Sequence, residues 1–556
     1  MTTNILNLKK NEVLKYFLDS RQYHSFELPE YFDFDRMLKS IKSVIGAKKY
    51  EDCICDNPER CAGVNLEIML NKDGAYGLRP LQLTNPVLYY FLSREVADNW
   101  QAIKDCFDSF KVPHIVSCAM PVVVKKGKEP FHKSSVILNW WTSMEQRSIE
   151  LSLQFRYMFI TDITNCYGSI DPTLFRAALN REGTNHAVDR NSELSGNLQK
   201  YLRAMQGGRN IGIPQGSALF DFIGEIILGY SDLLLYEALN KNGISDGYEI
   251  LRYRDDYRIF CNDRDLLERI SYILQSVLEN LNFRMNVQKT KISESVIIDS
   301  IKKDKLSYIY NTPVFNKKGC DFDSFEKHLL YILMFGRQHP NGGQLKILLS
   351  DLSKRITEWI EPVKAEVGDT VPLTEEEEKE TIWKKLTIIK KLPGGSVEAL
   401  VAVATQIGIE NISVVHHSLR IISQILTTLK TPESKIRIVN MVRNRFILLP
   451  NSDYVQIWLQ NLTYPYDTRR KEYPYTHLLC RMVAGCQTYV WNMGWLMPEL
   501  LEKLNFKSII QTKKLRNLEP IINFKENRLY DETRGDAPYS EQPAVTYMES
   551  ETITEI

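Results

Sequence analysis

The sequence LRYRDDYRIF, residues 251–260, places two adjacent acids inside an apolar and aromatic run of the composition typical of β-strands. An unpaired carboxylate is costly to bury, so a positive group is expected against Asp255 and Asp256. Divalent hard cations take oxygen ligands and can bridge the phosphates of a nucleotide. The stretch therefore predicts a strand, a turn and a strand, with a magnesium site at the tip. Taken alone, the dipeptide also fits a solvated turn in an ordinary hairpin.

An upstream segment, YMFITDITNCYGSI at residues 157–170, has the pattern of a strand that ends at an acid. Asp162 would close the metal site together with Asp255 from the neighbouring strand. Tyr167 follows shortly after and is placed to lie under the sugar of a bound nucleotide, where an aromatic ring collides with a 2′-hydroxyl. This segment predicts a preference for deoxynucleotides.

Two more segments complete the pattern. NIGIPQGS, residues 210–217, is a Gly/Pro turn that leads into an apolar helical run. Its Gly216 allows close approach of the backbone to a nucleotide, and Gln215 offers a neutral donor and acceptor. Beyond the paired acids, NVQKTK at 286–291 contains Lys289, which could reach a pyrophosphate leaving group. The order of four segments is far more specific than any one of them.

Together these segments resemble motifs A to D of reverse transcriptases, over roughly residues 76–292. Within that superfamily the chain is most similar to the bacterial abortive-infection and defence-associated enzymes of the "unknown group", in which a helical-repeat domain follows the polymerase core. The resemblance implies deoxynucleotide triphosphates as substrates, a DNA product, and Mg²⁺ as cofactor with Mn²⁺ as a substitute. The implied metal ligands are Asp162, Ile163, Asp255 and Asp256, and the implied catalytic residues are Asp162, Asp255, Asp256 and Lys289.

The region before motif A is similar to the fingers of the same enzymes. It contains YGLRP at 76–80 followed by NPVLYY at 85–90, and Arg79 would face the template or the triphosphate. The second basic motif of the fingers is degenerate, and Lys125 and Lys126 are the nearest candidates for triphosphate contacts. The alternative for these lysines is a solvated turn.

Charge and composition limit where nucleic acid could bind. The 556 residues contain 70 Lys and Arg against 69 Asp and Glu, so the basic surfaces needed to hold phosphates must be local. They are predicted at the fingers lysines, at Lys289 and Lys291, and on the strands that carry Arg252, Arg254 and Arg258.

The expected location is the bacterial cytoplasm, with no membrane partner. The sequence has no run of about twenty apolar residues and no secretion signal. Its ten cysteines are scattered and are expected to be reduced thiols. Cys53, Cys55 and Cys61 lack a close fourth ligand, and a zinc site there is the less favoured interpretation.

The predicted fold is an α+β fingers and palm of the right-hand polymerase type, followed by an all-α, HEAT-like helical-repeat domain in place of a thumb. The expected divisions are 1–70 for an N-terminal extension, 71–322 for fingers and palm, 323–528 for the helical domain and 529–556 for a disordered acidic tail. The resemblance further implies a homo-oligomer. Two basic and aromatic stretches, 462–475 and 512–516, are candidates for nucleic-acid contact, or alternatively a Pro-rich loop and a solvated charge run.

The function predicted is DNA synthesis by two-metal phosphoryl transfer, in antiphage defence, primed on a protein hydroxyl and without an ordinary template. One alternative is a conventional reverse transcriptase that copies a dedicated noncoding RNA. The alternative outside enzymology is a degenerate polymerase core that senses nucleotides or nucleic acid. The complete set of Asp162, Asp255, Asp256, Tyr167 and Gln215 argues against that sensor, which has no need of a metal triad.

Overall fold

The computed structural model describes residues 2–71, 77–124, 140–180, 191–311, 325–368, 397–427, 429, 431–467, 473–486 and 488–524. Lys125, Lys126 and the predicted acidic tail lie outside these described residues.

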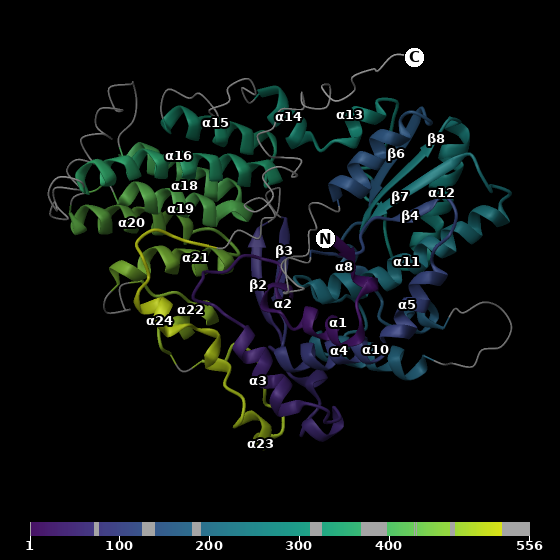
Figure 1. The fold of residues 1–556 in the computed structure, drawn as a ribbon, viewed down its shortest axis with the longest axis horizontal. Helices are drawn as coiled ribbons and strands as arrows, with labels where there is room; N and C mark the ends of the chain where they lie inside the picture. Colours follow the sequence, from purple (N-terminus) through teal and green to yellow (C-terminus); the bar gives the residue numbers. More distant parts are fainter. Residues whose placement is uncertain are drawn as a thin grey trace, which may run out of the picture.

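A five-stranded sheet carries the motifs, in the order β4-β7-β8-β6-β9. Its strands are β4 (Ile115–Ser117), β6 (Tyr157–Asp162), β7 (Tyr248–Tyr253), β8 (Asp256–Cys261) and β9 (Lys291–Ser293). All neighbours are antiparallel except β4 and β7. The predicted strand, turn and strand around the paired acids is therefore confirmed, and motif A lies on the adjacent strand (Figure 1).

Helices cover both faces of this sheet. On one face α12 (Arg264–Asn280) packs on β6 and β8, and it also contacts α11 (Ala218–Lys241). The length of α11 follows from its composition, because it is apolar on nearly all sides and most of its residues are buried. On the other face a smaller apolar cluster joins the sheet to α7 (Arg147–Leu151) and α13 (Val296–Ser300).

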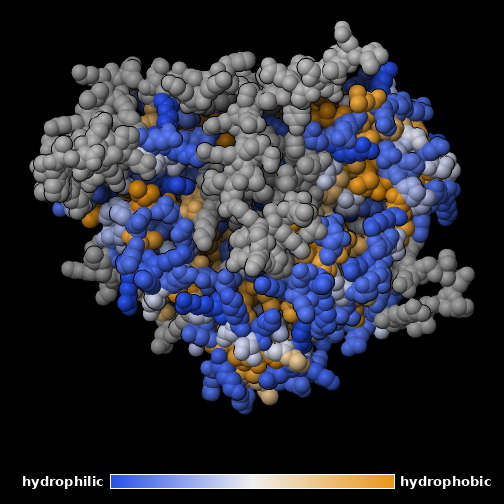
Figure 2. Space-filling view, in the orientation of Figure 1, coloured by the Kyte–Doolittle hydropathy of each residue, from blue (hydrophilic) through white to orange (hydrophobic). Residues whose placement is uncertain are grey.

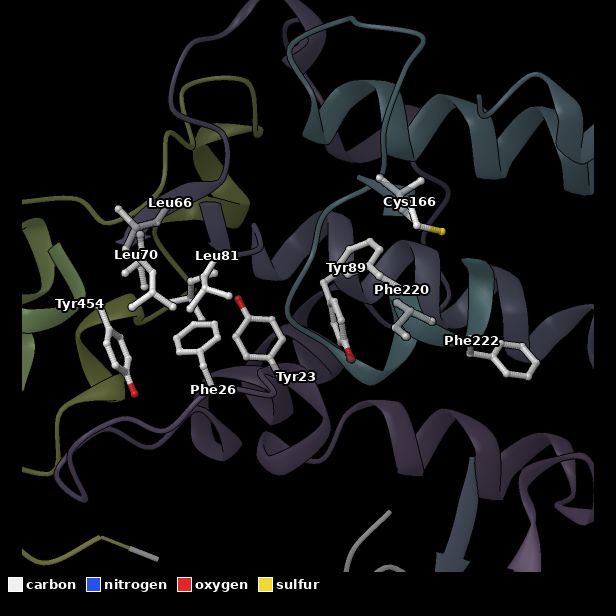
Figure 3. Packing of buried hydrophobic residues seen from close by; sticks show 14 of the residues in the cluster. Tyr23, Phe26, Leu66, Leu70, Leu81, Tyr89, Cys166, Phe220, Phe222 and Tyr454 are labelled. Atoms are coloured by element: carbon white, nitrogen blue, oxygen red, sulfur yellow. The ribbon is translucent and has the colours of Figure 1, made fainter. Parts of the chain in front are cut away.

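The main hydrophobic core connects the sheet region with the N-terminal part of the chain (Figure 3). Tyr23 and Tyr89 meet edge to face, with ring centroids 4.8 Å apart. The Tyr89 hydroxyl donates to the carbonyl of Phe17 at 2.9 Å, so this polar group is satisfied within the core. Phe222 of α11 packs against Phe17 and Trp100, which ties the N-terminal helices to the long central helix.

Two predicted elements are divided in the structure. The sequence predicts one helix from about 86 to 107, but the structure has two, α4 (Pro86–Asp98) and α5 (Trp100–Ser109), which meet at Asn99. The composition of residues 115–124 is strand-like, and the structure divides them into β4 and β5 (Val122–Val124). Strand β5 pairs with β1 (Thr2–Asn4) in a separate two-stranded sheet. Pro121 lies immediately before β5 and has no N–H to donate to a ladder, which favours a break there.

After β9 all the elements in the described part of the chain are helices. Apolar residues recur at helical spacing in successive segments between 325 and 462, which predicts a series of helices, and these helices are present. Helix α18 packs on α15 and α19, while α19 packs on α16 and α21 (Figure 1). These helices are α15 (Phe325–Gln338), α16 (Gly343–Gly368), α18 (Val397–Glu410), α19 (Val415–Leu426), α20 (Pro432–Phe446) and α21 (Asp453–Thr463). Their assignment to the HEAT-like repeat class stays a prediction.

The C-terminal segment 488–511 returns to the N-terminal extension. Leu496 forms a β-bridge with Ile54, and Ile510 forms one with Phe32. The Trp491 indole N–H donates to the carbonyl of Leu83 at 2.9 Å. In Figure 1 this yellow segment runs beside α3 (Asp35–Ile45), in agreement with the contacts of α3 with the short helix at 506–509. Residues far apart in the sequence thus share one core.

None of the described helices is long and apolar enough to cross a membrane. The face in Figure 2 is mostly hydrophilic where it is described, with hydrophobic residues exposed between the polar ones on the side that carries the sheet.

Candidate active site

Three aspartates gather at one end of the five-stranded sheet. Asp162 ends β6 and is the cross-strand partner of Asp256, the first residue of β8. Asp255 lies in the hairpin turn, and its carbonyl accepts a hydrogen bond from the Ile163 N–H at 3.0 Å. Arg254, the other turn residue, has a φ of 56°, a left-handed conformation that closes a two-residue turn. The backbone therefore brings motifs A and C together.

The electrostatics of this end of the sheet favour a bound cation. Asp162 is buried, and its Oδ1 atom has no hydrogen-bond partner within the described structure. Burial raises the pKa of Asp255, and the negative charge of Asp162 adds to that effect. Burial, and then the charge of Asp255, raise the pKa of Asp256 to about 7. Carboxylates held this close are stabilised as anions by positive charge.

Lys289 supplies part of that charge. Its Nζ atom lies 2.6 Å from Asp162 Oδ2, although the lysine side chain is 63% exposed. Partial burial alone would lower the pKa of Lys289, but the hydrogen bond and charge of Asp162 outweigh it and the pKa is raised. The ammonium group is thus protonated at neutral pH and points at the aspartates.

Magnesium fits this arrangement when the phosphates of a bound substrate supply some of its ligands. Among the described residues no group of three or more His, Cys, Asp or Glu side chains is arranged to hold a metal ion alone. Magnesium is commonly bound through one or two carboxylates plus water and substrate phosphates. Asp162, with its unpartnered Oδ1, and Asp255 provide two such carboxylates. Ile163 could contribute only its backbone carbonyl, because its side chain has no ligand atom.

Tyr167 is tied to both the hairpin and the central helix. Its hydroxyl donates to Asp221 Oδ1 at 2.8 Å, and Arg254 Nη2 lies 2.6 Å from Asp221 Oδ2. The carbonyl of Tyr167 accepts from the Ile213 N–H at 2.9 Å, which joins motif A to the Gly/Pro turn. Asp221 was not predicted from sequence, although an acid in the first turn of a long apolar helix is a recognisable signal.

Gln215 and Gly216 connect the site to the two-stranded ladder that contains Gln82. The Gln215 carbonyl accepts from Gln82 N–H at 3.0 Å, and Gln82 lies on β3 (Leu78–Leu83), which also carries exposed Arg79. Gly216 has a φ of 127°, and a Cβ there would lie 3.3 Å from the Gln82 carbonyl oxygen. Glycine is thus required by conformation and by close approach. Strand β3 pairs with β2 (Leu66–Asn71).

The prediction of a basic surface on the hairpin strands is wrong. Arg252 is fully buried and forms ion pairs with Glu225 at 3.1 Å and Asp232 at 2.8 Å, both on α11. Arg258 is also buried and donates to Ser148 Oγ at 2.8 Å, and Arg254 is paired with Asp221. These side chains hold the hairpin to α11 and α7 and are not available for phosphates. Two acids inside the apolar run of α11 were the sequence signal for a buried arginine, because they need a positive partner.

Other candidate sites change in the structure. Tyr473 and Tyr475 of the 462–475 stretch are buried, so their rings cannot stack on bases. The Cys55 thiol lies 3.4 Å from the Leu496 carbonyl oxygen, and the cysteines at 53, 55 and 61 belong to no described metal-ligating group. A cavity of about 970 Å³ lies between 61–67, 205–209 and the C-terminal segment, and none of the aspartates of the site lines it.

Comparisons with known proteins do not assign this chain to a family, so its function is inferred from the geometry of the site. The chain matches no protein-family model and no curated protein. It is similar to a solved structure of telomerase from Candida albicans in complex with a TWJ fragment of telomeric RNA. The identity is 12%, the match covers 76% of this chain and 68% of the telomerase chain, and the TM-score is 0.27. At this TM-score the two chains are not shown to share a fold.

Proposed function

We propose that this protein is a DNA polymerase of the reverse transcriptase type, which adds deoxynucleotides by two-metal phosphoryl transfer. The convergence of Asp162 with the Asp255 and Asp256 hairpin carries the proposal. Lys289 reaches Asp162 from the segment 286–291, and Tyr167, from the same segment as Asp162, is linked through Asp221 to the hairpin. A nucleotide sensor without catalysis has no need of neighbouring carboxylates whose pKa values are raised by burial and, to a smaller extent, by the charge of the next aspartate.

Each residue has a role that follows from its place. Asp162 and Asp255 hold the cation site, and Asp256 adds negative charge beside it. Bound magnesium supplies charge neutralisation at the phosphates and lowers the pKa of the primer hydroxyl. Lys289 is protonated and exposed, so its Nζ can donate a proton to the departing pyrophosphate. The Tyr167 ring, held by Asp221, excludes a 2′-hydroxyl from the sugar position.

The finer parts of the proposal rest on the sequence resemblance. They are a role in antiphage defence, priming from a protein hydroxyl, synthesis without an ordinary template, and assembly into a homo-oligomer. A noncoding RNA template is the competing possibility. Both share the same aspartate site, so the test must separate them by what the product is attached to and what it requires.

The test is incorporation of each labelled deoxynucleotide by purified protein with magnesium, with and without ribonuclease, followed by protease digestion of the product. We expect label that remains attached to protein, survives ribonuclease and is lost in Asp255→Asn. Asp265→Asn is the matched control, because Asp265 is an exposed acid in the first turn of α12. Incorporation that depends on copurifying RNA would indicate an RNA-templated enzyme. Undiminished incorporation by Asp255→Asn would contradict the proposed site.

A further inference from the structure

Asp221 connects three of the four motif segments through one carboxylate. It lies in the first turn of α11, directly after the Gly/Pro turn, and each of its oxygens has a different partner. Oδ1 accepts from the Tyr167 hydroxyl at 2.8 Å, and Oδ2 accepts from Arg254 Nη2 at 2.6 Å. Hydrogen bonds to an ionised group are shorter and about twice as strong as neutral ones. The network therefore fixes the tyrosine relative to the hairpin that holds Asp255.

The hydrogen bond from Tyr167 to Asp221, here called the tether, sets the position of the hydroxyl end of the Tyr167 side chain. The ring is half-buried against α11, where a Cβ built at Gly224 would lie 3.6 Å from its Cε1 atom. Tyr167 sits on a short helix, α8 (Cys166–Ser169), that begins after Asn165 with a φ of 50°. Burial, and then the charge of Asp221, raise the pKa of Tyr167 well above its usual value, so the hydroxyl stays a donor.

Arg254 makes the tether part of the hairpin. It occupies the left-handed position of the turn, next to Asp255, and its carbonyl accepts from Arg252 Nη1 at 3.2 Å. Arg252 is in turn held by Glu225 and Asp232 of the same helix. Movement of the turn would shift the Arg254 guanidinium, and Asp221 would transmit that shift to Tyr167. The position of the Tyr167 side chain is therefore coupled to that of the hairpin that carries Asp255.

We propose that Asp221 and Arg254 are positioning residues for sugar selection, which hold the Tyr167 ring where it excludes a ribonucleotide. This inference rests on the proposed polymerase function. It assigns the discrimination between deoxynucleotides and ribonucleotides to a three-residue network and not to the tyrosine ring alone. A ring without its tether can rotate away from the sugar, and the barrier to a 2′-hydroxyl falls.

The measurement is the ratio of kcat/KM for a deoxynucleotide to kcat/KM for the matching ribonucleotide. Tyr167→Phe keeps the ring and removes only the hydroxyl, and Asp221→Ala removes the acceptor. Each is expected to lower the ratio about tenfold, the effect of one lost hydrogen bond to a charged group. The double variant is expected to lower it no further, because both changes break the same contact. Asp221→Asn, which retains an acceptor for Tyr167, should keep more discrimination than Asp221→Ala.

Asp265→Ala is the matched control, since it removes a first-turn acid from α12 that has no contact with Tyr167. If Asp221→Ala does not fold, Tyr167→Phe decides, because the loss of one oxygen atom leaves the packing intact. An unchanged ratio in Tyr167→Phe, additive effects in the double variant, or a wild-type protein without sugar preference would each overturn the inference. Absence of all incorporation by the wild-type protein would instead overturn the proposed function.

Discussion

Arg252 and Asp232 form a buried ion pair under the aspartate hairpin, with Arg252 Nε 2.9 Å from both oxygens of Asp232. Glu225 pairs with the other side of the same guanidinium. Burial raises the pKa of Asp232 even though Arg252 opposes that effect, so the pair is held against a substantial desolvation cost. The arrangement fixes strand β7 on the central helix.

Removing Arg252 is expected to destabilise the protein strongly. Arg252→Met would leave two buried carboxylates without their positively charged partner, a loss of about 3–5 kcal/mol in the free energy of unfolding. Chemical denaturation followed by circular dichroism measures it. Lys111→Met, which breaks an exposed ion pair with Asp108, should cost less than about 1 kcal/mol. Equal stability of the two variants would contradict a structural role for the buried pair.

Magnesium is expected to stabilise the protein through Asp255. Binding to the folded state alone raises its stability by mass action, and for a chain of this size that is a rise of roughly 1–3 °C in Tm at saturating metal. Because Asp255→Asn also relieves repulsion with Asp162, the quantity to compare is the shift in Tm between magnesium and EDTA within each protein, in both cases with a deoxynucleotide triphosphate present. The shift should vanish in Asp255→Asn and persist in Asp265→Asn. The same shift in both variants would place the metal elsewhere.

Lys289 is expected to act through its proton as well as its charge. Lys289→Gln should slow single-turnover incorporation about a hundredfold, the usual contribution of a general acid. Lys289→Arg keeps a positive charge beside Asp162 but does not release a proton readily, so it should remain slow. Full activity in Lys289→Arg would show that Lys289 acts only through its positive charge. The control is Lys111→Gln, which removes an exposed lysine whose partner is Asp108.

The sequence was enough to predict the elements that depend on short apolar runs or on the periodic spacing of apolar residues. The strand endings at Asp162 and around Asp255 and Asp256 follow from short apolar runs, and the six helices from 325 to 463 follow from hydrophobic spacing. The order of the motifs was enough to predict that these aspartates meet, which register between β6 and β8 confirms.

What could not be predicted depends on pairs of residues distant in the chain. Arginine is a residue type usually found at the surface, and only its position between Glu225 and Asp232 makes Arg252 part of the core. The return of Leu496 to Ile54 is a backbone pairing with no side-chain pattern to reveal it. The link from Tyr167 to Arg254 runs through Asp221, whose relation to both depends on the turn that starts α11.

The pH dependence of stability should report on Asp256. Its pKa is about 7 in the folded protein and near 3.9 in an unfolded chain, so between these values the folded state binds more protons than the unfolded state. Stability from this group is therefore fully present below about pH 4, is lost as the pH rises to about 7, and stays lost above that. Asp256→Asn removes the titration. In EDTA the free energy of unfolding of the variant should therefore increase relative to that of the wild-type protein as the pH rises from 4 to 8. Because the side chain is only partly shielded from solvent, a difference on the order of 2 kcal/mol is expected, below the limit of about 4 set by the full pKa difference. Urea unfolding at a series of pH values measures it, and parallel curves for the two proteins would show that Asp256 ionises in the fold as it does in water.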